Sequence, residues 1–140
     1  MLQTGIEALL SADQALEVAL GVPRSDGFSG IFPVQMPQGA PLPSIVYTRI
    51  AGHEIDTLDG RGELKVSRIQ FSAYANHYGE ADAAAILAKE AFVGFRGKLP
   101  DAEETEVDQV MLVLETDSFD HTLKIYQVSF DVEIWFRNGS

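Results

Sequence analysis

The sequence predicts an α+β fold in which an antiparallel sheet of about four to five strands carries two helices on one face. Three observations predict it. Apolar residues recur at helical spacing in residues 1–20 and again after residue 78. Residues 122–137 alternate between apolar and polar side chains, as a strand with one buried face does. Turn residues separate the other strand-forming segments, which gives the order α-β-β-β-α-β-β.

The first predicted helix covers residues 1–20 and breaks near Ser11. Thr4-Gly5-Ile6-Glu7 and Ser11-Ala12-Asp13-Gln14 both fit a capping box, so the second would restart the helix. Gly21-Val22-Pro23 ends it, because Gly supplies a left-handed cap and Pro cannot continue a helix. The apolar positions of this helix are Ile6, Leu9, Leu10, Leu16 and Leu20.

Residues 23–43 hold five of the six prolines and predict turns, with a short edge strand at Ile31 to Gln35. Strands are expected at Ser44 to Ile50 and at Leu64 to Tyr74. The connection between them, Ala51 to Glu63, contains the turn pair Asp59-Gly60 and is longer than an ordinary hairpin loop. We therefore expect a long hairpin or flexible arm that projects between the second and third strands.

The second helix is expected over Tyr78 to Phe95, with Asn76 as its cap, and an alanine-rich face would let it sit close to the sheet. Val107 to Glu115 follows as a strand in which Val110, Leu112 and Leu114 alternate. Thr116 to His121 is expected to be a polar turn, and Thr122 to Arg137 is the last strand.

No helix is expected on the second face of the sheet. Ile125, Trp135 and Met111 would emerge there between polar residues. That face, or an open edge strand, is therefore available for pairing with another copy of the chain.

Composition predicts a single domain, residues 1–140, that is soluble and intracellular. The length of 140 residues is near the modal size of one domain. The absence of cysteine excludes disulfides, and the N-terminus does not resemble a signal peptide. The formal net charge of −11 disfavours tight binding of nucleic acid, which depends on Lys and Arg. Such a charge fits either simple solubility or a passage through which DNA slides without adhering.

Motifs that carry chemistry are not found, so the sequence predicts a non-enzyme without cofactor or metal. His53 stands near Glu54, Asp56 and Asp59, yet the spacing matches no metalloenzyme motif, and a solvated acidic loop is the favoured interpretation. The carboxylates of Asp56, Asp59 and Glu63 lack an apolar pocket that would raise a pKa for acid–base work. His77 is assigned no role, and a tight turn accounts for His121.

Several segments, in order, resemble the tail-completion family of long-tailed phages, prophages and gene transfer agents. The resemblance covers nearly the whole chain, although each segment alone is turn chemistry or strand pattern. The segments are residues 8–16, Gly30-Ile31-Phe32-Pro33, residues 37–47, Thr57-Leu58-Asp59-Gly60-Arg61, residues 68–75 and Ile134-Trp135-Phe136-Arg137.

The resemblance implies a tail terminator. Such proteins form rings, often hexameric, that cap the finished tail tube and join it to the head–tail connector. The implied partners are other copies of the chain, the tail tube protein and the connector, with DNA only in transit and no membrane. The implied locations are the bacterial host cytoplasm during assembly and the tail of the particle. The family has no catalytic residues to transfer.

The projecting arm is the expected interface with neighbouring copies. Its candidate residues are His53, Glu54, Asp56, Leu58, Asp59, Arg61 and Glu63. Three other functions remain open: another head–tail joining or minor tail component, a small-molecule-binding or enzymatic α+β domain, and an acidic effector or immunity-like protein. The second would require an apolar pocket ringed by polar groups.

Overall fold

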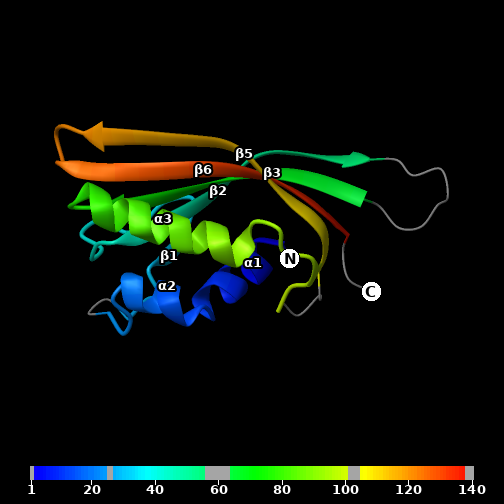
Figure 1. Cartoon of the computed structure of the whole chain (residues 1–140), viewed down its shortest axis with the longest axis horizontal. Coiled ribbons are helices and arrows are strands. Elements are labelled where there is room, and N and C mark those ends of the chain that lie inside the picture. The colour runs from blue at the N-terminus through cyan, green and yellow to red at the C-terminus, as the bar shows by residue number, and fades with distance from the viewer. Residues whose placement is uncertain (1, 25–26, 56–63, 101–104, 138–140) are drawn as a thin grey trace.

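The computed structural model describes residues 2–24, 27–55, 64–100 and 105–137. In this part of the chain one six-stranded sheet carries three helices on one face (Figure 1). The α+β class and the placement of the helices were correctly predicted. The predicted order and strand number were wrong, because the first helix forms two separate helices and the two-residue strand Gly97–Lys98 was not predicted.

The N-terminal helix divides near Ser11, as predicted, but both predicted capping boxes are wrong, because α1 begins before Thr4 and the N-cap of α2 is Asp13, not Ser11. Helix α1 spans Leu2–Ser11, and α2 spans Gln14–Ala19. Asp13 caps α2, since its carboxylate Oδ1 accepts a hydrogen bond of 2.9 Å from the backbone N–H of Leu16. Gly21 follows with φ +74°, the left-handed conformation expected after a helix end.

The sheet runs in the order β1-β2-β3-β6-β5-β4. Strand β1 pairs parallel to β2, and all other neighbours pair antiparallel. Their bounds are Ile31–Pro33 (β1), Ser44–Ile55 (β2), Leu64–Ala75 (β3), Gly97–Lys98 (β4), Glu106–Asp120 (β5) and Ile125–Arg137 (β6). The short edge strand predicted near Ile31 is thus β1.

Helix α3, Tyr78–Phe92, lies directly on β3 and β6, and α1 and α2 pack beside it (Figure 1). It ends three residues before the predicted Phe95, because Val93 is extended and Gly94 has φ +85°. Its N-cap is His77, without a side-chain cap bond, and not Asn76 as predicted. The alanine face is confirmed: Ala81, Ala84, Ala85 and Ala88 are all buried.

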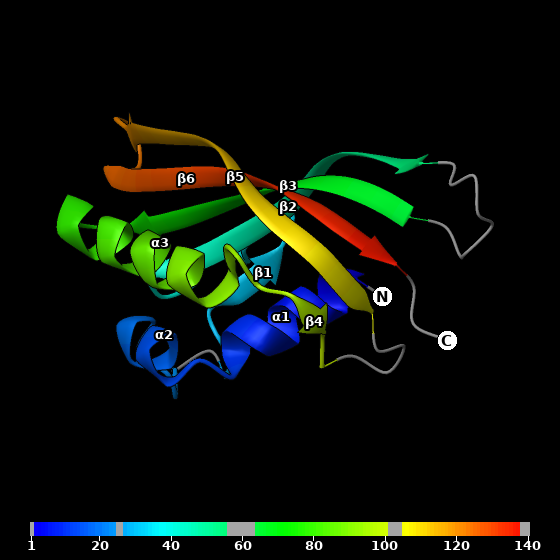
Figure 2. The ribbon, with the colours of Figure 1, turned by 45° about the vertical axis from the view of Figure 1, so that its right-hand side comes forward.

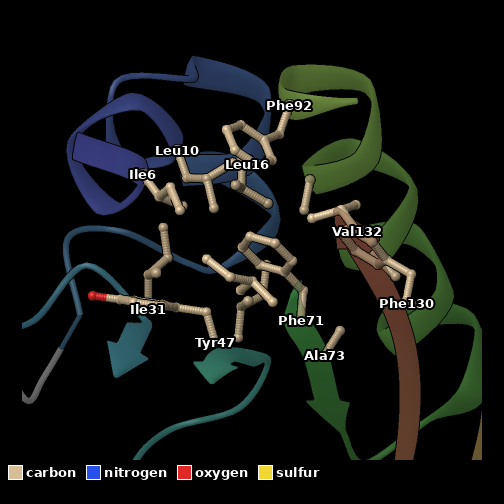
Figure 3. Packing of buried hydrophobic residues seen from close by; sticks show 14 of the residues in the cluster. Ile6, Leu10, Leu16, Ile31, Tyr47, Phe71, Ala73, Phe92, Phe130 and Val132 are labelled. Carbon is tan, nitrogen blue, oxygen red and sulfur yellow. The ribbon is translucent and has the colours of Figure 1, made fainter. Parts of the chain in front are cut away.

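The core lies between the sheet and the helices. Phe71 of β3 stacks on Phe130 of β6, with ring centroids 5.0 Å apart, and meets Phe92 of α3 at 5.8 Å (Figure 3). The predicted alternation of β6 is confirmed, since its inward residues belong to this core: Val128, Phe130, Val132, Ile134 and Phe136. These buried rings fix the sheet against α3.

Strand β5 differs most from expectation. Residues 116–120, predicted as a turn, continue the strand, and the turn is confined to residues 121–124. The pairing of Asp120 with Ile125 closes a tight hairpin. As a result β5 runs along the molecule from this hairpin to β4 (Figure 2). Polar residues do not end the strand here, because residues 116–120 pair with residues 125–129 of β6.

Candidate assembly surfaces

The hairpin of β2 and β3 extends beyond the helices (Figure 1). The two strands pair continuously from Ser44↔Tyr74 to Ile55↔Leu64, with one irregularity between Arg49 and Ala51. The predicted strand end at Ile50 was therefore wrong, and the first part of the predicted arm is regular β-structure. The register shift is that of a β-bulge, in which one extra residue interrupts the pairing locally and the strand continues beyond it.

The seven predicted interface residues are only partly placed. His53 lies opposite Val66, and Glu54 lies opposite Lys65, at the outer end of the hairpin. The other five lie outside the described residues: Asp56, Leu58, Asp59, Arg61 and Glu63. The grouping of these seven residues into one contact surface stays a prediction.

An open hollow of about 450 Å³ lies beside the outer half of this hairpin. Residues 49–52 of β2 and residues 65–67 of β3 line it, together with Phe136 of β6. Arg49 and Lys65 give the hollow two cationic side chains, and Gly52 contributes no side chain to fill it. The hollow is therefore open and partly cationic.

The sheet face opposite the helices is polar and internally bonded. Ser72 and Ser129 hydroxyls lie 2.8 Å apart, and Gln127 Nε2 donates to both. Arg68 donates through Nε and Nη2 to Asp131 Oδ2, at 3.1 and 2.9 Å. The prediction of a polar second face is correct, but Ser72, Ser129 and Asp131 are buried. These side-chain hydrogen bonds join the two central strands, β3 and β6, across the sheet.

A second hollow, of about 370 Å³, lies between α3 and the C-terminal half of β5. Lys89 forms an ion pair with Glu115, and the Tyr78 hydroxyl donates to Asp117 Oδ2 at 2.8 Å. The bond to Asp117 raises the pKa of Tyr78 and keeps its hydroxyl protonated. These contacts hold α3 against β5, and Asp117 lies in the part of β5 that was predicted as a turn.

Neither hollow resembles the enclosed apolar pocket that a small-molecule site needs, since both are open and charged side chains line part of each. The described residues contain no cluster of His, Asp and Glu that would hold a metal ion. His121 packs edge-on against Phe119, with ring centroids 5.0 Å apart. The preceding Asp120 accepts hydrogen bonds from the backbone N–H groups of Thr122 and Leu123, as expected for a turn.

The outer edge of β5 carries the surface that sequence patterns did not predict. Met111, Leu112, Val113 and Leu114 are each between 43 and 47% exposed. Only Val110, of the three residues expected to alternate on one face, is buried. The register shifts between Leu112 and Leu114, which breaks the alternation of Val110, Leu112 and Leu114. A run of four consecutive apolar residues was the available signal.

Comparison with known proteins identifies the family. The family model for tail completion protein gp17 matches residues 4–137. The chain belongs to this family. No sequence among the curated proteins matches it. Among solved structures, a chain from the virion of a native gene transfer agent particle has the same fold, with a TM-score of 0.69 and 16% identity. The alignment covers 98% of this chain and 95% of that one.

Membership of the tail completion family supports a structural role in a phage-type tail and agrees with the resemblance noted from the sequence. The family thus indicates a structural tail protein. No helix in the described ranges is long and apolar enough to cross a membrane.

Proposed function

We propose that this protein closes the end of a tail tube as a ring of identical copies and joins the tube to the head–tail connector. The family match over residues 4–137 carries the proposal. The projecting hairpin and the exposed edge of β5 support it, because a ring subunit needs two different surfaces for its two neighbours. One ring face would match the tube protein, and the other would receive the connector.

The acidic character of the chain fits this role. A ring at this position surrounds the path of the genome, and a formal charge of −11 per copy disfavours adhesion of phosphate groups. DNA is then cargo in transit and not a bound ligand. The protein would act in the host cytoplasm during assembly and remain in the tail of the particle.

The outer end of the β2–β3 hairpin, residues 53–63, is the proposed contact with neighbouring copies. It includes His53 and Glu54, at the end of the paired strands, and the acidic and apolar residues that follow in the sequence. The paired ends of β2 and β3 lie beyond the helices, so shortening the segment between them should leave the core residues in place (Figure 2).

Deletion of residues 53–62, with an Asn-Gly turn in their place, tests the proposal. We expect a folded chain, with the thermal melting curve of the intact protein, that fails to complete tails in particles lacking the natural copy. Intact protein supplied in the same host is the positive control. Infectious particles assembled from the shortened chain would refute the role of the hairpin, and labelled copies found only at the distal tail tip would favour a minor tail component.

A further inference from the structure

The outer edge of β5 is an open strand edge with an apolar run. Strand β4 pairs with it only at Glu106 and Val107, and the backbone N–H of Gly94 reaches the carbonyl of Val110. In the described part of the chain, no strand pairs with this edge beyond that point. Natural proteins protect such edges with Lys or Pro, yet residues 106–120 contain neither.

The opposite side of the sheet has a second open edge. Strand β1 covers β2 only from Ile45 to Tyr47, so in the described residues the outer edge of β2 from Thr48 to Ile55 has no strand beside it. Ile50 on this edge is 51% exposed. The cationic hollow lined by Arg49 and Lys65 adjoins it.

Charge decides which edges can meet. Residues 106–120 carry five acidic side chains and no Lys or Arg. Lys89 pairs with Glu115 and Arg137 with Asp108, yet the strand keeps an excess of negative charge, so two β5 edges placed side by side would repel each other. Residues 48–55 carry one Arg and one Glu and are neutral apart from His53. The neutral β2 edge can therefore meet β5 without this repulsion, whereas a second β5 edge cannot.

We propose that the β5 edge of one copy pairs with the β2 edge of the next copy and so continues the sheet from subunit to subunit. This inference rests on the proposed ring and names the surfaces that close it. Two different edges make a head-to-tail contact, which generates a closed ring when the rotation between copies closes, whereas a β5–β5 contact would stop at a dimer. Met111–Leu114 would then lie near Ile50 of the neighbour.

The unpaired edge segments of β5 and β2 extend toward opposite ends of the molecule. The β5 segment runs to the hairpin of β5 and β6 at one end, and the β2 segment runs to the projecting hairpin at the other (Figure 1). Neighbouring copies are therefore offset along the strand direction. A closed sheet requires such a stagger, since its strands must tilt from the ring axis.

Two matched substitutions test the edge. Val113→Lys places a charge in the β5 edge, and Val18→Lys makes the same change on α2, where the side chain is 79% exposed. Light-scattering mass and negative-stain images of the full chain over a concentration series measure assembly. We expect Val113→Lys to raise the concentration needed for rings by about tenfold or more, and Val18→Lys to leave it unchanged. Melting curves of both variants verify folding.

Cross-linking tests the pairing itself, and the absence of natural cysteines makes it specific. Leu114→Cys chains mixed with Ile50→Cys chains and a short bismaleimide should give linked pairs of the two. Leu114→Cys chains alone, or mixed with Val18→Cys chains, should give few. Abundant links between two Leu114→Cys chains would overturn the head-to-tail arrangement.

The outcomes separate the two proposals. If the intact protein forms rings and Val113→Lys forms them equally well, the β5–β2 contact is overturned while the ring stands. If the intact protein remains monomeric at every concentration, alone and with tube protein, and no link joins positions 114 and 50, both the ring and the edge contact are overturned.

Discussion

The loop that leads into β2 depends on one buried arginine, and Gly30→Ala should disturb it. Arg24 donates from Nη1 to the carbonyl of Pro43 at 2.8 Å and from Nη2 to Ser44 Oγ at 2.9 Å, and Nη2 also bonds the carbonyl of Pro41. Arg24 is 9% exposed. A Cβ at Gly30 would lie well inside contact distance of Arg24 Nη1. The substitution therefore displaces the guanidinium from the start of β2.

The magnitude follows from two contributions. Gly30 has φ +84°, and a side chain in this conformation costs about 1–2 kcal/mol. Loss of one charge-assisted hydrogen bond costs about 1.5–3 kcal/mol more. Gly39→Ala is the matched control, because Gly39 has φ +78° and nothing within 4 Å of the added Cβ, so only the first cost applies.

Thermal unfolding followed by circular dichroism measures the difference. For a chain of this length about 1 kcal/mol corresponds to roughly 3–4 °C, so Gly30→Ala should melt about 5–12 °C below Gly39→Ala. Equal melting temperatures for the two variants would show that Arg24 relocates without loss, and would refute its role as an anchor.

Three further predictions concern the core and the helices. Phe71→Ala removes the ring that contacts Phe130 and should cost about 3–5 kcal/mol in urea unfolding; a cost below about 1 kcal/mol would contradict the packing. Asp13→Ala removes the cap of α2 and should cost about 0.5–2 kcal/mol, while Asp13→Ser should retain most of the stability. Burial, followed by the bond to Glu7, raises the pKa of Tyr47, so its contribution to stability is complete below the unfolded pKa near 10 and declines at higher pH. The gap in melting temperature between the intact chain and Tyr47→Phe should therefore narrow above about pH 10, and a constant gap would contradict the assignment.

Local patterns predicted the elements whose signal is local. The break near Ser11 was predicted from residues that favour a cap, although the cap itself is Asp13. The strand β6 follows from alternation, because it is central and buries one face against α3. Arg24 could not be predicted as an anchor, since its acceptors lie 17 to 20 residues away in the sequence. Its role depends on how the proline-rich loop folds back onto Arg24, and the spacing of apolar residues in the sequence does not predict that.

The candidate assembly surface shows the same limit. Whether Met111–Leu114 are buried depends on the position of β5 in the sheet, and strand order is not encoded in the strand's own pattern. An apolar run on a central strand would be core, whereas on an edge strand it is available to another molecule. In the proposed contact, the exposed run, the acidic charge of β5 and the neutral edge of β2 would make the pairing directional. A directional contact whose rotation closes gives a ring, the finite assembly in which neither edge would remain open.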